Sequence, residues 1–339
     1  MNATQAAPFH IVTGFLGAGK TTFLNALLKD PALAGALVIV NEFGDVGLDH
    51  WLYETLEGEV ALLASGCLCC QLRGDLIDTL HDLFARRDSG ALTPFTRVII
   101  ETSGLADPAP ILHALIADPE LARRLRLAGV VTLLDGVNGA ATLGAHPEAR
   151  RQLALADVVT ITKRDLAPDA SALEALARDI NPAARFADRI EAADFLDESL
   201  VSPPATRASK MSAHGGARAF SYFDDAPISE AALGPFFEAL HRLAGPKLLR
   251  VKGLIYTRAH PSAPLVIQGA QHLVHAPRRL AVWPMAKPQT QLVVIVDGPA
   301  EIEIAALWRA LRGVPEIDRP DLAALSDNPL APRRGGLFG

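Results

Sequence analysis

The sequence predicts an α/β protein in which a doubly wound, mostly parallel sheet is followed by a second, smaller α+β domain. From residue 8 to about residue 190, short apolar and β-branched runs alternate with helical patterns, as in successive βαβ units. The chain has 339 residues, which favours two domains over one. Between residues 200 and 217 the sequence is rich in Ser, Pro, Ala and Gly, which is typical of a linker.

The first half of the chain contains the runs expected of a parallel sheet and its covering helices. Residue 169 is an Asp, a residue type that favours the N-cap of a helix. The expected strands are 9–13, 36–40, 60–63, 97–101, 129–134 and 158–162. The expected helices are 20–29, 73–87, 109–116 and 169–180.

The second half has fewer helical patterns, and its strands follow one another more closely, which indicates an α+β module. Strands are expected at 218–223, 248–257, 264–268 and 291–296, with helices around 229–243 and 301–311. We therefore expect a first domain over residues 1–200, a linker over 201–217, a second domain over 218–325 and a flexible tail over 326–339.

Composition and charge exclude several classes of function. The net charge is -6, so the protein has no overall positive field for unspecific binding of nucleic acid or an anionic membrane. The longest apolar runs, such as 32–40 and 128–134, are far shorter than the roughly 20 residues of a membrane-spanning helix. The first ten residues lack the pattern of a signal peptide, so we expect a cytoplasmic protein.

A glycine-rich segment between the first expected strand and helix has the pattern of a phosphate loop. Residues 14–21 read Gly-Phe-Leu-Gly-Ala-Gly-Lys-Thr, which matches G-x-x-x-x-G-K-[ST]. Backbone N–H groups of such a loop hold phosphates, Lys20 reaches the β- and γ-phosphate oxygens, and Thr21 is a ligand for Mg²⁺. The expected nucleotide-binding residues here are Gly14, Gly17, Ala18, Gly19, Lys20, Thr21 and Thr22.

A second phosphate-sensing element is expected where the strand 97–101 ends. Glu101 closes this apolar strand, and Gly104 follows three residues later, an acid-x-x-Gly pattern with Glu in place of the more usual Asp. Gly104 would donate its N–H to a γ-phosphate, and Glu101 would bind Mg²⁺ through water or orient the attacking water. We therefore expect Lys20, Glu101 and Gly104 to be the catalytic residues.

The strand 158–162 leads into a variant of the guanine-recognition motif Asn-Lys-x-Asp. Here it reads Thr162, Lys163, Arg164 and Asp165. A carboxylate accepts hydrogen bonds from both N1–H and the N2 amine of guanine, which adenine does not offer, so Asp165 predicts GTP as the nucleotide. Lys163 would lay its alkyl stem across the base. The competing interpretation is a solvated turn at a strand end.

All three cysteines of the chain lie together, at Cys67, Cys69 and Cys70. Thiolates are soft ligands that suit Zn²⁺, Co²⁺, Ni²⁺ or Cu⁺, and three of them leave a coordination position for another ligand. Carboxylates of the segment 41–50, Glu42 and Asp45, would complete this metal shell or bind Mg²⁺, or else are solvated loop charges. A redox pair at Cys69 and Cys70, or buried inert cysteines, are the alternatives.

Together and in this order, these motifs resemble the CobW-type metallochaperone GTPases, which are P-loop GTPases of the SIMIBI class with a C-terminal CobW domain. The resemblance is strong over residues 8–190. Residues 249–253, Leu-Arg-Val-Lys-Gly, resemble the family's Arg-x-Lys-Gly strand more loosely.

The resemblance implies a Mg²⁺-dependent GTPase of low intrinsic turnover that binds a transition metal at the cysteines, Zn²⁺ first and Co²⁺ or Ni²⁺ as alternatives. It implies delivery of that metal to a client metalloenzyme or a cofactor-assembly protein. It also leaves room for a homodimer that depends on nucleotide or metal.

Two functions from other classes stay open at this point. One is a nucleotide-dependent metal or redox sensor that hands no ion to a client. The other is a P-loop ATPase switch without a metal, which Asp165 and the cysteines disfavour. The cysteines lie in sequence between 41–49 and 101–107, the two expected nucleotide-sensing loops, so we expect metal binding and nucleotide binding to be coupled.

Overall fold

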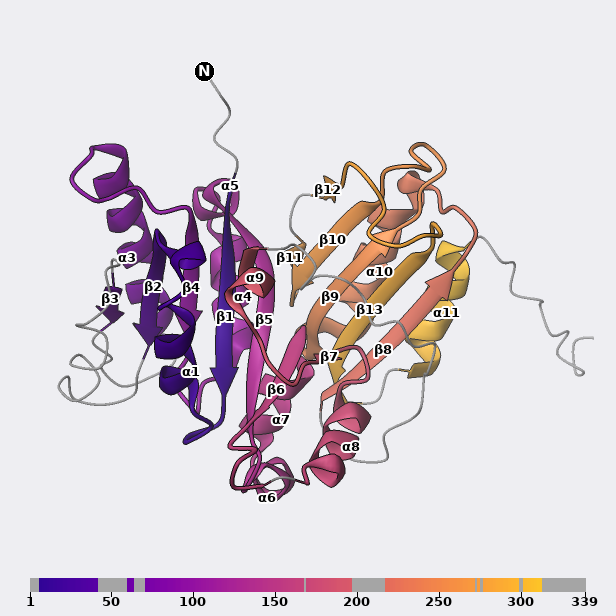
Figure 1. Cartoon of the computed structure of the whole chain (residues 1–339). Coiled ribbons are helices and arrows are strands. Elements are labelled where there is room, and N and C mark those ends of the chain that lie inside the picture. The colour runs from indigo at the N-terminus through magenta and orange to yellow at the C-terminus, as the bar shows by residue number, and fades with distance from the viewer. Residues whose placement is uncertain are drawn as a thin grey trace, which may run out of the picture.

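In the computed structural model the described residues are 6–41, 60–63, 71–167, 169–196, 217–271, 273–274, 277–298 and 301–312. They form two sheets that lie side by side, one built from the first half of the chain and one from the second half (Figure 1). The expected α/β fold with a second, smaller domain is confirmed. The expected linker lies outside the described residues except for Ala217, and the expected tail lies outside them entirely.

The first sheet has the strand order β3-β2-β4-β1-β5-β6-β7, and each neighbouring pair in it is parallel. In a parallel sheet all strands end at the same edge, so the loops that follow β1, β4 and β6 meet there. The strands are β1 (Ala7–Gly14), β2 (Ala36–Asn41), β3 (Val60–Leu63), β4 (Arg97–Glu101), β5 (Leu125–Asp135), β6 (Val158–Thr162) and β7 (Arg185–Phe186).

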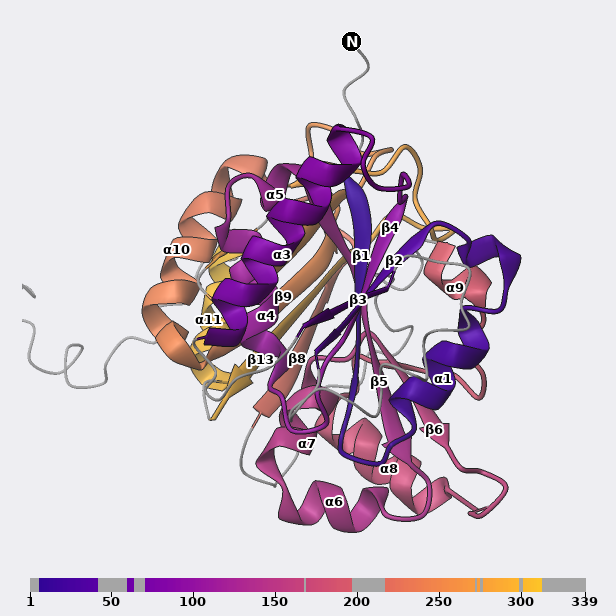
Figure 2. The ribbon, with the colours of Figure 1, turned by 90° about the vertical axis from the view of Figure 1, so that its left-hand side faces the viewer.

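Helices cover both faces of this sheet, as the doubly wound prediction requires. Along β1, Phe9 and Ile11 belong to one apolar core and Val12 to the core of the opposite face, because successive side chains of a strand alternate. Viewed along the sheet, α1 and α9 lie on one side and α3 and α4 on the other (Figure 2). The helices are α1 (Lys20–Leu27), η1 (Pro31–Leu33), α3 (Gln71–Asp88), α4 (Pro108–Ala117), α5 (Leu121–Arg124), α6 (Gly139–Ala145), α7 (Pro147–Ala154), α8 (Ser171–Ile180) and α9 (Ala192–Leu196).

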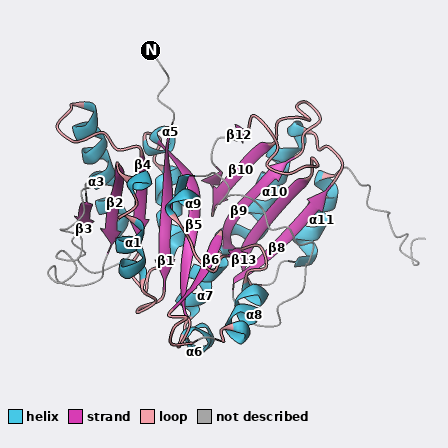
Figure 3. Cartoon of the chain, viewed as in Figure 1, coloured by secondary structure: helices cyan, strands magenta, loops and turns pink. Residues whose placement is uncertain are grey.

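The second sheet is antiparallel, with the order β11-β10-β9-β13-β8 and with β12 paired to β10. Helices α10 and α11 pack on one of its faces, as Figure 3 shows. No helix among the described residues is both long and apolar enough to cross a membrane. The elements are β8 (Ala217–Asp224), η3 (Glu230–Ala232), α10 (Leu233–Ala244), η4 (Gly245–Lys247), β9 (Leu248–Ile255), β10 (Leu265–Ala270), β11 (Leu273–Val274), β12 (Arg278–Arg279), β13 (Thr290–Asp297) and α11 (Glu301–Leu311).

The other face of the second sheet packs directly on the first domain. Leu249 of β9 and Ile295 of β13 belong to the same buried cluster as Leu112 of α4 and Leu125 of β5. The two domains therefore share one continuous apolar core, and each shields the other's apolar surface from water.

A buried ion cluster lies within this interface. Asp157, just before β6, accepts a hydrogen bond from the N–H of Val130 at 2.8 Å. Its carboxylate pairs with Arg250 Nη2 at 2.8 Å and with Lys252 Nζ at 2.6 Å, and these side chains are at most 3% exposed. Arg250 and Lys252 are two residues apart on β9, so both reach the same face of that strand. The Arg-x-Lys-Gly strand is therefore the strand that docks the second domain.

One carboxylate in this cluster faces two cations, and this imbalance and burial together shift the pKa values of the cluster. Burial raises the pKa of Asp157, but the charges of Arg250 and Lys252 lower it by a larger amount, so the net shift is downward. The pKa of Lys252 is also lowered: burial and the charge of Arg250 lower it, and the attraction of Asp157 offsets them only in part.

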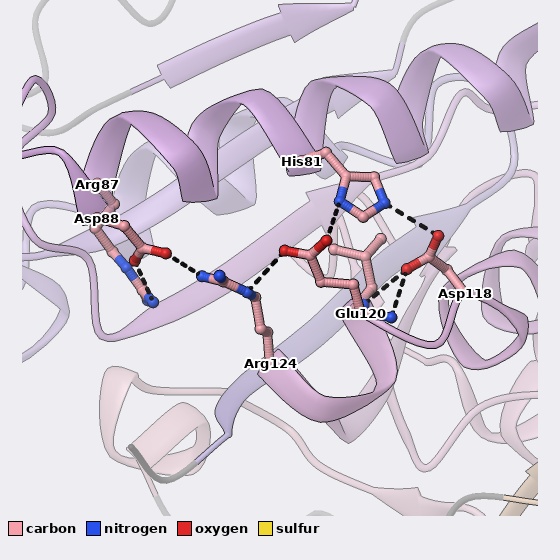
Figure 4. Close-up of polar contacts among 7 residues, drawn as sticks. His81, Arg87, Asp88, Asp118, Glu120 and Arg124 are labelled. Carbon is pink, nitrogen blue, oxygen red and sulfur yellow. Dashed lines mark hydrogen bonds and ion pairs between the residues drawn. The ribbon is translucent and has the colours of Figure 1, made fainter. Parts of the chain in front are cut away.

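A second polar network fixes helix α3, which begins directly after the cysteine motif (Figure 4). His81 of α3 contacts Asp118 Oδ2 through Nε2 at 3.0 Å and Glu120 Oε2 through Nδ1 at 3.4 Å. Arg124 of α5 binds Glu120 at 3.1 Å and Asp88, the last residue of α3, at 2.6 Å. Each exposed ion pair contributes at most about 1 kcal/mol, but together they hold α3 against α5 at two points.

The buried cluster predicts a large effect of neutralising Asp157. Asp157→Asn leaves two buried cations without their anion, so we expect a loss of about 3–5 kcal/mol in the free energy of unfolding, measured by denaturant titration. Asp82→Asn makes the same change in an exposed pair with Arg86 on α3 and should cost less than about 1 kcal/mol.

The cluster also predicts a dependence on pH. Because the folded-state pKa of Asp157 lies below its unfolded value, its contribution is complete above about pH 4 and is lost as the pH falls through the folded value. The parent protein should therefore lose more stability on acidification than Asp157→Asn does. Equal costs for the Asp157 and Asp82 variants, or equal acid sensitivity of the parent and Asp157→Asn, would contradict the assignment.

Candidate nucleotide and metal site

The glycine-rich segment forms the predicted strand-loop-helix unit at the centre of the sheet. β1 ends at Gly14 and α1 begins at Lys20. Gly19, the N-cap residue of α1, has φ 86°, a left-handed conformation that a residue with a Cβ rarely adopts. The loop therefore delivers its backbone N–H groups and the positive end of the α1 dipole to one place, which is the arrangement that binds phosphate.

Lys20 is buried and folds back over this loop, with Nζ donating to the carbonyl oxygen of Gly14 at 3.1 Å. The ammonium group is thereby held above the backbone of the loop. Gly17 and Ala18 lie in the loop itself, and Thr22 is exposed in the first turn of α1.

The expected Mg²⁺ ligands lie together at the carboxyl ends of β1 and β4. The Thr21 hydroxyl donates to Glu101 Oε1 at 3.0 Å, and Glu101 is fully buried. A hydroxyl and a carboxylate beside a phosphate loop are hard oxygen donors of the kind that Mg²⁺ prefers. These two residues therefore fit the ion that accompanies a bound nucleotide.

The loop after β4 packs tightly against the phosphate loop. Thr102 donates to the hydroxyl of Thr13 at 2.7 Å. A Cβ placed on Gly104 would lie 2.6 Å from the Cα atom of Leu16, so no side chain fits at this position. The Gly104 backbone therefore lies directly against the phosphate loop, and its contact with a terminal phosphate stays a prediction.

Two residues that hold this loop were missed by the sequence reasoning. Gln152 is fully buried and donates from Nε2 to the carbonyl oxygens of Gly104, at 3.1 Å, and Ala106, at 2.9 Å. Asp107 caps α4 by accepting a hydrogen bond from the N–H of Ala109 at 2.9 Å. An Asp just before a Pro-initiated helix is a recognisable capping signal, whereas nothing local marks Gln152.

The threonine that replaces asparagine in the guanine motif has a structural role. Thr162 donates from its hydroxyl to the carbonyl oxygens of Ala18, at 2.9 Å, and Leu134, at 3.1 Å. It therefore ties the end of β6 to the phosphate loop and to β5. The change from Asn to Thr keeps a hydrogen-bond donor at this position.

Lys163 is oriented by a residue that the sequence reasoning also missed. Its backbone has φ 53°, and its Nζ pairs with Asp135 Oδ2 at 2.7 Å. Burial raises the pKa of Asp135, but the hydrogen bonds from Lys163 and from the N–H groups of Asn138 and Val137 lower it by more. The net shift of this pKa is therefore downward. Asp165, two residues after Lys163, is exposed. Asp135 could have been identified from its position, because it is the last residue of the neighbouring strand β5.

A cavity of about 420 Å³ opens beside Thr162. It lies between α1 and the loop after β7, and Arg164 of the guanine motif pairs with Asp188 of that loop at 3.0 Å. Its size suits a small organic ligand. The lining residues are Phe23, Ala26, Leu27, Asp30, Thr160, Thr162, Asp188, Arg189, Ile190, Glu191 and Ala192.

The expected transition-metal ligands Cys67, Cys69, Cys70, Glu42 and Asp45 lie outside the described residues. The strands that precede the two segments are described: β2 ends at Asn41 and β3 at Leu63, and these residues are register partners in the sheet. Both segments therefore begin at neighbouring strand ends on the edge that carries the phosphate loop. Within the described part of the chain, no group of three or more His, Cys, Asp or Glu residues is placed to hold a metal.

Comparison with known proteins agrees with this geometry over both domains. The CobW/HypB/UreG nucleotide-binding domain matches residues 8–188, and the C-terminal domain of the cobalamin synthesis protein CobW matches residues 217–312. The zinc chaperone CobW of Pseudomonas aeruginosa is 38% identical over 156 residues, which are 43% of this chain and 40% of that protein.

A second relative matches nearly the whole chain. The zinc chaperone YjiA of Escherichia coli is 32% identical over 316 residues, which are 89% of this chain and 98% of that protein. The crystal structure of the Zn(II)-bound YjiA GTPase matches with a TM-score of 0.69 and 27% identity, and the match covers 91% of this chain and 100% of that one. The chain therefore belongs to the CobW/HypB/UreG family and is a two-domain GTPase homologous to the zinc chaperone YjiA.

Proposed function

We propose that this GTPase binds Zn²⁺ at Cys67, Cys69 and Cys70 and delivers it to a client protein when GTP is hydrolysed. The observation that carries the proposal is the position of strand β3, which the cysteine segment follows in the sequence. The end of β3 is the register partner of the end of β2, and both strands end on the sheet edge that carries the phosphate loop. The zinc-chaperone relatives support Zn²⁺ over Co²⁺ or Ni²⁺ as the cargo.

The described residues include a candidate for each contact that GTP would make. Backbone N–H groups at the start of α1 and the Lys20 ammonium would neutralise the phosphates, and the Gly104 N–H would contact the γ-phosphate. Thr21 and Glu101 would hold Mg²⁺, which neutralises charge that develops on the phosphate oxygens. Asp165 would accept the two guanine N–H donors, while Lys163, held by Asp135, would lie over the base.

The metal side of the proposal uses thiolate chemistry. Three cysteine thiolates would bind Zn²⁺, with a carboxylate of Glu42 or Asp45, or a group of the client, as the fourth ligand. The cysteine segment leads directly into α3, which Asp118 holds at His81 and Arg124 holds at the last residue, Asp88. A rearrangement of the nucleotide loops would therefore act on the end of the cysteine segment that follows β3, through the neighbouring ends of β2 and β3.

The partner would be a metalloenzyme or a cofactor-assembly protein that takes the ion when the nucleotide loops relax. A homodimer that forms with nucleotide or metal is a second partner state consistent with the family. A metal or redox sensor would share the nucleotide and metal sites but would transfer no ion. Transfer to an acceptor is therefore the property that separates the two functions.

The phosphate loop predicts that Lys20→Ala lowers the rate of GTP hydrolysis at least about 100-fold, because it removes a positive charge from the transition state. Phosphate release is the measurement. Lys29→Ala, just after the other end of the same helix, removes an exposed ammonium and should leave the rate unchanged. Near-parental turnover in Lys20→Ala would overturn the phosphate-loop assignment.

The guanine motif predicts that Asp165→Asn weakens GTP binding roughly 10- to 100-fold and improves binding of xanthosine triphosphate. The reason is that the C2 oxygen of xanthine needs a hydrogen-bond donor where guanine needs an acceptor. Affinities for both nucleotides can be measured by fluorescence competition. Asp78→Asn makes the same charge change on an exposed position of α3 and is the control. Unchanged GTP affinity in Asp165→Asn would make Asp165 a surface charge.

The cysteine motif predicts that replacing Cys67, Cys69 and Cys70 by Ser abolishes tight Zn²⁺ binding and leaves GTP binding within about twofold of the parent, since hydroxyls are poor, weakly acidic ligands for zinc. Zinc affinity is measured by competition with a chromophoric chelator. Transfer is measured in a second assay, with an apo zinc enzyme as the acceptor. The zinc-loaded parent should restore the activity of this enzyme only when GTP is present.

Two results would contradict this prediction. Equal zinc stoichiometry in the parent and the triple-serine protein would make the cysteines structural. Tight zinc binding by the parent without transfer to any acceptor would favour the sensor.

A further inference from the structure

The end of helix α7 contacts the nucleotide-sensing loop and the second domain through neighbouring side chains. Gln152 holds the backbone of this loop at Gly104 and Ala106. Arg151 pairs with Asp107 Oδ2 at 3.5 Å and with Asp297 Oδ2 at 3.0 Å. Asp107 is the last residue of the loop before α4, and Asp297 is the last residue of β13 in the second domain. A single guanidinium therefore joins the loop to the second domain.

The same end of α7 is anchored to the second domain at a buried point. Arg250 of β9 donates from Nη1 to the carbonyl oxygen of Leu155 at 2.7 Å and also pairs with Asp157. Leu155 and Asp157 follow Arg151 by four and six residues. Because Arg250 and Asp157 are fully buried, this anchor holds the end of α7 firmly against the second domain.

The contacts differ in how firmly they hold. Gln152, Arg250 and Asp157 are buried, whereas the side chains of Arg151, Asp107 and Asp297 are 42%, 24% and 32% exposed. Water and salt screen the Arg151 pairs, so they can break without unfolding the interface. The buried contacts act as a fixed base, and the Arg151 pairs act as the adjustable link between the second domain and the loop.

We infer that Arg151 is a positioning residue for GTP hydrolysis. Through Asp297, the second domain helps to fix the position of the Gly104 loop relative to the phosphate loop. The inference rests on the proposed GTPase site, because Gly104 matters only if it contacts a γ-phosphate. It assigns the second domain a regulatory role: a molecule that binds at the end of β13 and draws Asp297 away from Arg151 would change the response of the site to GTP.

The inference predicts an effect on GTP that GDP does not share, because only GTP carries the phosphate that Gly104 would contact. Asp297→Asn should weaken binding of a non-hydrolysable GTP analogue about three- to fivefold, the range expected for a partly exposed ion pair, and leave GDP affinity within about 1.5-fold of the parent. Asp225→Asn makes the same change in an exposed pair with Lys287 of the same domain and is the control. Both variants should unfold at the parental temperature.

A double-mutant cycle tests whether Asp297 acts through Arg151. If it does, Arg151→Gln and the double variant Arg151→Gln/Asp297→Asn should have the same ratio of GDP to GTP-analogue affinity. Additive effects would show that Asp297 acts by another route, and an Asp297→Asn ratio equal to that of Asp225→Asn would show that the second domain does not position the loop. Either result overturns the inference if the parent protein still binds and hydrolyses GTP. If the parent neither binds nor hydrolyses GTP, the proposed GTPase site itself is refuted.

Discussion

The parallel pairing of β1 with β4 and β5 is the constraint on which the described site depends. Val12 of β1 is the register partner of Glu101, and Gly14 is the register partner of Leu133. This register places the start of the phosphate loop beside the acid that ends β4. The Thr21 contact to Glu101 and the close approach of Gly104 to Leu16 both follow from it. Neither contact can form unless these strands end at one edge.

The interface between the domains adds a second constraint, because it fixes α7 and the start of β6. Asp157 is bound by Val130 of the first domain and by Arg250 and Lys252 of the second. Burying three charges has a high desolvation cost, so this cluster contributes less net stability than an apolar contact of the same size. What it supplies is a defined docking position for the second sheet, since a shifted β9 would leave buried charges unmatched.

Much of the fold could be predicted from sequence because its strands are continuous apolar runs, as strands buried on both faces must be. Prediction failed over residues 139–154, where α6 and α7 are short, are rich in Ala and Gly or Arg, and contain few large apolar side chains. The start of α8 was placed at 169, whereas it begins at Ser171, with Asp169 accepting a hydrogen bond from the Ser171 N–H. The two-residue strand β7 carries too few side chains to form a pattern.

For the site, the sequence could single out candidate nucleotide residues because each belongs to a short motif with fixed spacing. Asp135, Gln152 and the Asp157 cluster could not be found in this way, because the long-range partners described above lie between 27 and 95 residues away in the chain. Such contacts exist only once the strand order is known. The cysteines and the carboxylates of Glu42 and Asp45 stay predictions, since they lie outside the described residues.

The central claim is that the nucleotide controls the metal, and the most direct test is the zinc dissociation constant measured with a non-hydrolysable GTP analogue and again with GDP. Because the cysteine segment and the nucleotide loops start from neighbouring strand ends, we expect zinc to bind at least about fivefold more tightly with the GTP analogue. By linkage, zinc should tighten binding of the analogue relative to GDP by the same factor. Equal zinc affinity in the two nucleotide states would contradict the account.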